Sequence, residues 1–336
     1  MNIKTVYIEI TNQCNFNCRT CYNRSGRNLE TREISVQTFK NIISIFSRYG
    51  ANRYLLSGGE PTLHSEFDAI LDVIEEHPEL SFGLVTNGSC RNPRLIDVLK
   101  RSRNISLQIS LDGSCEEENA KTRGTGHFIP AIEFIRLLSP LPDKPLLKMV
   151  ISKLNLSDVE NFYRLAVSLD CIPEYAFIYR SGNGMDGWDD KSLSAADKSK
   201  VLNLIEQLNV RYGISAFLPL CTTRCLFVNG MTELSLSVKT DGFIQPCQSL
   251  YHSDFSLGNI FAFDAYAFSQ RVDAIYALAK ERTTRDYGCA KCILREGCGK
   301  GCMAEAYHLS EDPLGNDGNC MLRKIQFIQF NVKKPQ

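Results

Sequence analysis

The stretch Cys14-Asn15-Phe16-Asn17-Cys18-Arg19-Thr20-Cys21 follows closely on an alternating apolar segment at residues 6–10. Because such alternation predicts a strand, the three cysteines are expected in the loop that leaves its carboxyl end. Three thiolates on one loop can hold three irons of a 4Fe–4S cube, for which four cysteine ligands are usual. The missing fourth ligand leaves one iron open to another molecule. A zinc site or a chance spacing is the alternative explanation.

A strand–helix rhythm continues outward from this loop through the first two thirds of the chain. Strands are expected at residues 6–10, 53–57, 82–86, 105–111, 146–152 and 175–179. Helices are expected at residues 36–48, 65–76, 93–101, 129–138 and 195–211, with another opening at Ser157 in a capping box with Glu160. Successive βα units predict a parallel sheet with right-handed crossovers. Six units fall short of a closed eight-stranded barrel, so the sequence predicts an α/β fold, a partial (β/α)6 TIM-like barrel.

Polar and glycine-rich segments stand at the carboxyl ends of the expected strands. Residues 57–61 follow the second strand, Thr86-Asn87-Gly88 the third, and Asp112-Gly113 the fourth. In folds of this kind the chemistry gathers in these βα loops. We therefore expect these segments and the cysteine loop to form one site.

Composition limits the classes of function. The 336 residues contain 38 basic and 38 acidic side chains, so the chain lacks the electrostatic footprint of a nucleic-acid-binding protein. No apolar run approaches the length of a membrane span, and the first ten residues lack a signal-peptide core. These features predict a cytoplasmic protein. In a reducing cytosol, 14 closely spaced cysteines indicate metal more often than disulfides.

The strand–helix rhythm stops near residue 215, which predicts two domains at residues 1–215 and 216–336. The second is expected to be a small cysteine-rich α+β domain, with a hairpin at residues 234–244 turning at Thr240-Asp241-Gly242. Its densest cysteine array is Cys289-x2-Cys292-x5-Cys298-x3-Cys302, followed by Cys320 and preceded by Cys221, Cys225 and Cys247. Eight thiols suit two iron–sulfur cubes, and a zinc knuckle is the alternative.

The first cysteine motif and its neighbours resemble the radical S-adenosylmethionine (radical SAM) superfamily. The resemblance implies that Cys14, Cys18 and Cys21 hold the cluster and that Gly58-Gly59-Glu60-Pro61 binds the methionine amino group, with Glu60 as acceptor. It further implies cofactor contacts for Asn87, a ribose contact for Ser110 and a carboxylate contact for Arg123. The residue before the third cysteine is usually aromatic in that family. Here it is Thr20, so adenine packing falls to Phe16, Tyr22 or others.

The C-terminal cysteines resemble the SPASM extension of that superfamily, which carries two auxiliary 4Fe–4S clusters. By this resemblance the outer cluster takes Cys289, Cys292, Cys298 and Cys320, and the inner one takes Cys247, Cys302, Cys225 and Cys221. The spacer from Cys225 to Gly242 is longer than is usual there. Either both Cys221 and Cys225 ligate, or one position stays open for substrate.

The resemblance also implies a mechanism and partners. Reductive cleavage of S-adenosylmethionine gives a 5′-deoxyadenosyl radical that takes a hydrogen from substrate, with electrons from a reductase such as flavodoxin or ferredoxin. Most such enzymes crosslink, epimerise or oxidise ribosomally made peptides, so a precursor peptide is the expected substrate. Because the chain starts almost at its first strand, we expect a separate recognition protein, a direct contact with the leader of the peptide, or a small substrate. Gln248 stands where sulfatase-maturing relatives have aspartate, which argues against that activity.

The sequence leaves two alternative functions open. One is a radical SAM dehydrogenase or epimerase of a small molecule such as a sugar. The other, of a different class, is a zinc-stabilised binding protein without catalysis.

Three further features of the sequence give weaker indications of function. Gly182-Asn-Gly184-Met-Asp-Gly187 spells G-x-G-x-x-G, which we interpret as a flexible loop over the site that touches substrate with Trp188. His252 and Asp254 are weak candidates for proton transfer. The isolated thiols Cys90, Cys115 and Cys171 are expected to be buried and structural.

Overall fold

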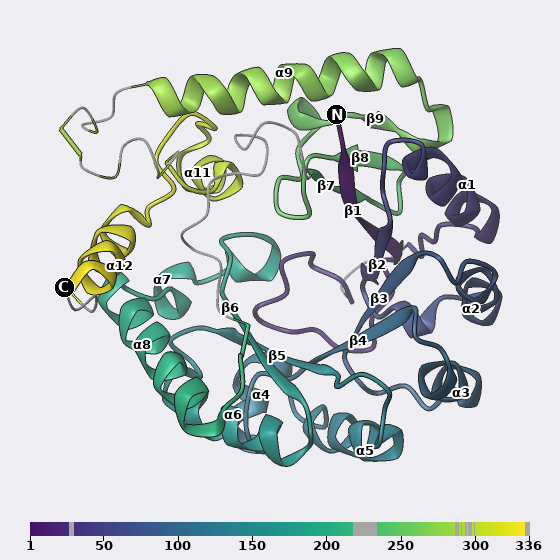
Figure 1. Cartoon of the computed structure of the whole chain (residues 1–336), viewed down its shortest axis with the longest axis horizontal. Coiled ribbons are helices and arrows are strands. Elements are labelled where there is room, and N and C mark those ends of the chain that lie inside the picture. Colours follow the sequence, from purple (N-terminus) through teal and green to yellow (C-terminus); the bar gives the residue numbers. More distant parts are fainter. Residues whose placement is uncertain are drawn as a thin grey trace.

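The computed structural model describes residues 1–26, 30–217, 234–285 and 300–332, together with residues 289, 291, 292, 294 and 298. Six parallel strands form an arc with helices on its outer side (Figure 1). These strands are β1 Ile3–Thr11, β2 Arg53–Gly58, β3 Ser81–Thr86, β4 Ile105–Ser110, β5 Leu146–Ile151 and β6 Ile172–Phe177. They run in sequence order across the sheet, so the partial (β/α)6 barrel expected from the sequence is confirmed.

The helices that follow these strands are α1 Val36–Ser47, α2 Phe67–Glu76, α3 Pro93–Arg101, α4 Glu116–Arg123, α5 Phe128–Leu138, α6 Val159–Ser168, α7 Trp188–Lys191 and α8 Ala195–Tyr212. Except for α4 and the short α7, these helices form where apolar residues recur at helical spacing. In α1 the buried side chains are Phe39, Ile42, Ile43 and Phe46, and Ser35 caps the helix by accepting from the Thr38 N–H at 3.1 Å.

Alternation along the strands separates two environments. In β1, Val6 and Ile8 are fully buried in the core beneath the helices, whereas Tyr7 lines the inside of the arc. Burying each such aliphatic side chain contributes about 1.5–3 kcal/mol. The outer layer therefore holds the fold together, and the inner faces of the strands are left to form a site.

The sheet continues into the C-terminal third of the chain. β7 Leu234–Val238 pairs parallel with β1, and β8 Phe243–Gln245 pairs antiparallel with β7, which confirms the expected hairpin. The next strand, β9 Gly258–Asn259, pairs antiparallel with β8. The helices that follow it are α9 Ala265–Thr284, α11 Met303–Ser310 and α12 Cys320–Val332. The strands before and after residue 215 therefore belong to one continuous sheet, which extends across the expected domain boundary.

Two local expectations were wrong. Ser157 and Glu160 do not form a capping box, because a 3-10 turn at Leu156–Asp158 precedes α6 and Asp158 is its N-cap. Cys115 is exposed at the start of α4, although Cys171 is buried as expected and Cys90 is partly buried.

Even the longest helix described, α9 with 20 residues, lacks the sustained apolar run of a bilayer-spanning segment, and the other described helices lack it too.

Candidate active site

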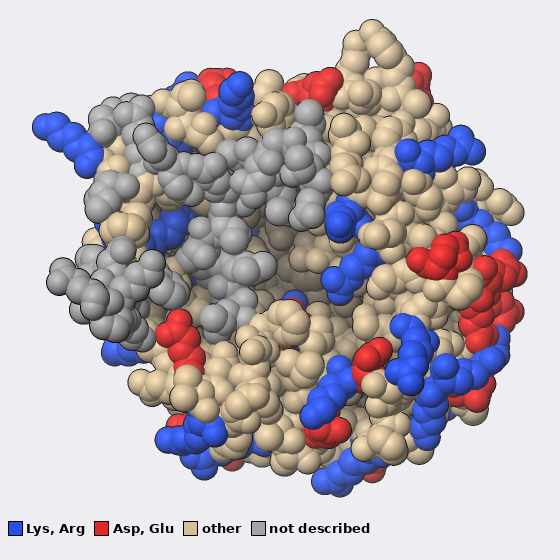
Figure 2. All heavy atoms as spheres, viewed as in Figure 1, with Lys and Arg blue, Asp and Glu red and all other residues tan. Residues whose placement is uncertain are grey.

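A cavity of about 460 Å³ lies inside the arc of strands. The face shown in Figure 2 is hollowed at its centre, with charged side chains of both signs around it. The cavity is lined by Cys14, Cys18 and Cys21 from the cysteine loop and by residues of all six barrel strands. The structure therefore brings the expected metal ligands to the expected site.

Backbone contacts fix the cysteine loop against the end of β2. The N–H of Gly59 donates to the Thr11 carbonyl at 2.8 Å, and the N–H of Glu60 donates to the Gln13 carbonyl at 2.7 Å. A Cβ at Gly59 would stand 2.0 Å from the Gln13 carbonyl oxygen, and one at Gly58, where φ is +123°, would stand 2.2 Å from that of Thr11. Glycine is required at both positions because the two loops are in contact.

The cysteine side chains are partly buried. Burial raises the pKa of the Cys14 thiol to about 11 and that of Cys18 to about 12. Both thiols are therefore protonated at neutral pH in the metal-free chain, and a metal would displace their protons on binding.

Glu60 is buried between the β2 and β3 loops. Its side chain is 1% exposed and accepts from the hydroxyls of Thr62 and Thr86, both at 2.7 Å, and from the Asn87 N–H at 2.6 Å. Burial raises the pKa of Glu60, while these hydrogen bonds act against that shift. Neither Glu60 nor Pro61 lines the cavity, whereas Gly58 and Gly59 do. In this structure Glu60 ties the β2 and β3 loops together, and its contact with the methionine amino group stays a prediction.

Asn87, Ser110 and Arg123 all line the cavity, as expected. Asn87 also donates from its side chain to Asn15 Oδ1 at 2.8 Å, which joins the β3 loop to the cysteine loop. Phe16 and Tyr22, the expected partners for adenine, line the same space, as does Thr20.

Arg123 is a buried cation next to the cysteine loop. Its Nη1 lies 4.0 Å from the Cys18 sulfur, and its Nε lies 3.1 Å from Asp112 Oδ2. Asp112 is fully buried and also accepts from the Val150 N–H at 2.8 Å. Burial acts to lower the pKa of Arg123, but the Asp112 carboxylate outweighs it and raises that pKa, so the guanidinium remains charged. A positive group is therefore held at the cavity wall beside the thiols.

A comparison with protein families gives a match to the Radical SAM superfamily over residues 8–166, from β1 into α6. That range contains the three cysteines, the Gly58-Gly59 segment and Arg123 in the geometry described above. The chain belongs to the radical SAM superfamily. Membership makes S-adenosylmethionine and a 4Fe–4S cluster its cofactors, and the residues fit them, since three cysteine side chains and a buried cation share one cavity. It also favours an enzyme over the zinc-stabilised binding protein.

Relatives extend the match through the C-terminal third. The mycofactocin maturase MftC of Mycolicibacterium smegmatis is 26% identical over 329 residues, covering 93% of this chain and 81% of the relative. Streptococcus suis SuiB bound to precursor peptide SuiA superposes with a TM-score of 0.75 at 16% identity, over 94% of this chain and 75% of SuiB. The anSMEcpe structure with bound AdoMet and Cp18Cys peptide gives 0.76 at 17% identity, over 99% and 97%. The resemblance to radical SAM enzymes with a SPASM extension is confirmed by these matches.

The C-terminal third contributes directly to the radical SAM cavity. Gln248 and Ser249, which follow Cys247 and β8, line it. A buried ion pair secures this region, because Lys239 Nζ lies 2.9 Å from Glu9 Oε2 on β1 and donates to Asn23 Oδ1 at 2.6 Å. His252 and Asp254, the weak candidates for proton transfer, are exposed and do not line the cavity.

Four of the C-terminal cysteines gather around a second, small cavity of about 30 Å³. These are Cys289, Cys292, Cys298 and Cys320, the set expected for the outer cluster. Cys302 lies nearby in sequence, and its backbone N–H donates to Asp317, which Arg323 clamps with contacts of 2.7 and 2.8 Å. Cys221 and Cys225 lie outside the described residues. In the part of the chain that the structure describes, no three His, Cys, Asp or Glu side chains converge as one metal ion at about 2.3 Å from each ligand would require.

Sequence reasoning missed two features of the site. A Lys148–Glu174 ion pair of 2.9 Å lies on β5 and β6 inside the cavity, in register with Ser110 on β4. Period-2 alternation could have placed both side chains on the inner face. The other is the segment after β6, whose G-x-G-x-x-G we interpreted as a flexible loop. It forms a 3-10 turn, Gly182–Gly184, packed against the cysteine loop, so that interpretation was wrong.

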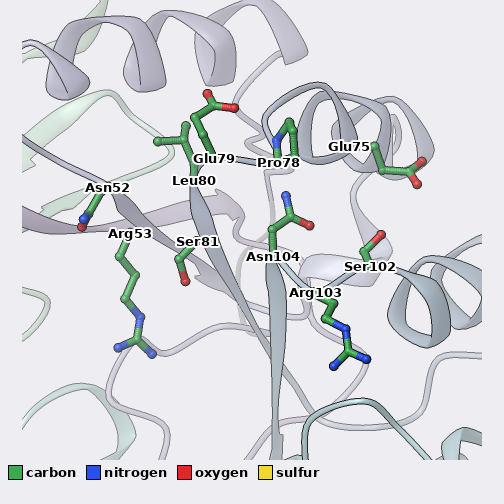
Figure 3. A pocket seen from close by; sticks show the side chains of 10 residues that line it. All are labelled: Asn52, Arg53, Glu75, Pro78, Glu79, Leu80, Ser81, Ser102, Arg103 and Asn104. Carbon is green, nitrogen blue, oxygen red and sulfur yellow. The ribbon is translucent and has the colours of Figure 1, made fainter.

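A further hollow of about 520 Å³ lies at the opposite ends of the strands (Figure 3). It is lined by Arg53 and Ser81 at the starts of β2 and β3, and by Arg103 and Asn104 just before β4. Its lining contains no cysteine and none of the βα-loop residues. We assign it no part in the radical chemistry.

Proposed function

We propose that this radical SAM enzyme acts on a ribosomally made peptide, which it crosslinks, epimerises or oxidises. The observation that carries the proposal is the match to the mycofactocin maturase, which runs beyond the family domain and covers 93% of this chain. Two proteins with the same fold have been solved with peptides, namely precursor peptide SuiA on SuiB and Cp18Cys peptide on anSMEcpe. Those peptides belong to the other proteins and support only the class of substrate proposed here.

When bound, the cluster and S-adenosylmethionine would supply the radical chemistry that removes a hydrogen from substrate. The chain's own residues bind and orient. The glycines at 58 and 59 bring the β2 loop close to the cysteine loop, and Arg123 offers a charged donor for a carboxylate. Aliphatic residues of the inner strand faces, such as Leu55, enclose the space and keep water from it.

We further propose two auxiliary 4Fe–4S clusters in a SPASM domain at residues 216–336. The outer cluster takes Cys289, Cys292, Cys298 and Cys320, and the shared cavity supports this set. The inner cluster takes Cys247 and Cys302 with Cys225 and Cys221. Because Gln248 follows Cys247 directly and lines the main cavity, the inner cluster would stand beside the substrate and could accept its electron.

Two protein partners complete the proposal. A reductase such as flavodoxin or ferredoxin supplies electrons, and a separate recognition protein presents the precursor peptide. The exposed charges of both signs in Figure 2 are compatible with transient docking of either partner.

The test is to incubate the anaerobically purified enzyme with S-adenosylmethionine, dithionite and a synthetic peptide encoded by a short gene beside its own. Mass spectrometry should find a changed peptide mass with the native chain and none with Cys18→Ala. As a matched control, Cys171→Ala removes a buried thiol away from the cavity and should leave the modification intact. A mass change in a sugar, with every such peptide unmodified, would instead establish the small-molecule alternative.

A further inference from the structure

The segment at residues 181–191, after β6, packs against the back of the cysteine loop. Gly182 has a φ of +56°, and a Cβ there would stand 2.3 Å from the Tyr22 carbonyl oxygen. Ser181 Oγ donates to that same carbonyl at 3.3 Å. Glycine is therefore required at position 182 because the segment contacts the cysteine loop there. This requirement is unrelated to binding of a dinucleotide.

Asn183 links this segment to two of the cluster ligands. It is 1% exposed, its backbone N–H donates to the Cys21 carbonyl at 2.7 Å, and its side-chain Nδ2 donates to the Cys18 carbonyl at 2.8 Å. Both hydrogen bonds hold the backbone from which the thiols project. The relative position of Cys18 and Cys21 is thus fixed from behind.

Lys191, at the end of α7, places a buried charge at the same point. Its side chain reaches three backbone carbonyls, those of Arg19 at 3.0 Å, Asn183 at 2.9 Å and Asp186 at 2.5 Å. The residue is 4% exposed, and the nearby Asp186 carboxylate pairs with Arg24 at 2.8 Å. Arg19 lies between Cys18 and Cys21, so the ammonium stands directly behind the cluster-binding loop.

We propose that Lys191 is a positioning residue that also sets the reduction potential of the cluster held by Cys14, Cys18 and Cys21. Reduction adds a negative charge to the cluster, and a buried cation nearby stabilises that charge more strongly than an exposed one would. Cluster potentials depend on net charge and on hydrogen bonds around the ligands. Lys191 supplies the charge, and Asn183 with Gly182 holds the loop at a fixed distance from it.

The test compares four variants of the full chain, purified without oxygen and assayed for iron and sulfide. Lys191→Met removes the charge, Lys191→Arg keeps it, and Asn183→Ala loosens the loop without changing charge. The matched control is Lys153→Met, because Lys153 also donates to a carbonyl of this segment, that of Asp189 at 2.8 Å, but from an exposed side chain. The readout is the midpoint potential of the cluster whose electron paramagnetic resonance signal responds to S-adenosylmethionine.

We expect a more negative midpoint for Lys191→Met, and a midpoint near that of the native chain for Lys191→Arg and Lys153→Met. The Lys191→Met variant should also cleave S-adenosylmethionine more slowly with a weak reductant, with a smaller deficit when titanium(III) citrate is used. Asn183→Ala should lower the iron content, and the cluster that remains should have a midpoint potential near that of the native chain.

An unchanged midpoint in Lys191→Met with full iron would overturn the proposal. If that variant loses its iron, Lys191→Gln replaces it. Loss of iron from both, with retention in Lys191→Arg, would overturn potential tuning in favour of a purely structural role. These measurements need no peptide, so their failure would leave the proposed substrate class untouched.

Discussion

His127 gives the cysteine loop a defined sensitivity to acid. Its imidazole is 1% exposed and packs edge-on against Phe16, with ring centroids 4.7 Å apart. The side-chain Oδ1 of Asn119 accepts from the Asp112 N–H, so its side-chain Nδ2 is left to donate to His127 Nδ1 at 3.0 Å. Burial, with a further contribution from the nearby Arg123 charge, lowers the pKa of His127 to about 3.

The sign and size of the effect follow from that pKa. A histidine in an unfolded chain titrates near ~6.5. Below that value the unfolded state binds a proton that the folded state refuses until the pH approaches 3, so stability is lost as the pH falls through this window. At pH 5 the solution is about 1.5 pH units below the pKa of the imidazole in the unfolded chain. Protonation of the unfolded chain then lowers the free energy of unfolding by about 2 kcal/mol.

The assay is urea unfolding of anaerobic protein at pH 7.5 and pH 5, comparing the native chain with His127→Asn. The loss of free energy of unfolding between the two pH values should be about 2 kcal/mol smaller in His127→Asn, because its side chain does not titrate there. An equal loss in His127→Asn would refute the reasoning.

Three further predictions concern the cofactors and the buried charges. Arg123→Met should raise the Kd for S-adenosylmethionine by about 10–100-fold, because a charge-assisted hydrogen bond contributes about 1.5–3 kcal/mol, and equilibrium dialysis measures this; an unchanged Kd would exclude the carboxylate contact. Cys320→Ala should lower iron by about four atoms per chain in a colorimetric assay while 5′-deoxyadenosine still forms, and unchanged iron would contradict the outer cluster. Lys239→Met leaves Glu9 buried without its partner and should cost about 3–5 kcal/mol in urea unfolding, with the loss reduced in the Glu9→Gln double variant; no loss would contradict the role of this ion pair.

The sequence predicted the barrel well because its strands and most of its helices carry strong periodicity. All six strands lie within a few residues of their expected bounds. The exception is α4, Glu116–Arg123, whose sequence is polar throughout and offers no apolar stripe. It forms at a βα loop, and its last residue, Arg123, reaches the cavity.

Tertiary contacts between distant segments could not be predicted in the same way. A Gly-Gly-Glu-Pro motif indicates a close approach of backbone, but nothing in it shows that Glu60 would accept from the Asn87 N–H, 27 residues away. Likewise, the glycines after β6 indicate a turn without showing that Asn183 contacts Cys18, 165 residues earlier. The pairing of β7 with β1 has the same character, since strand order across long separations leaves no local signal.

The central claim is that Cys14, Cys18 and Cys21 hold a cluster that cleaves S-adenosylmethionine, and one measurement tests it most directly. Anaerobic protein is mixed with dithionite and S-adenosylmethionine, and 5′-deoxyadenosine is quantified by mass spectrometry beside the iron content. We expect 5′-deoxyadenosine with roughly twelve irons per chain, and loss of the product in Cys18→Ala. Zinc in place of iron, or product formed equally by Cys18→Ala, would contradict it.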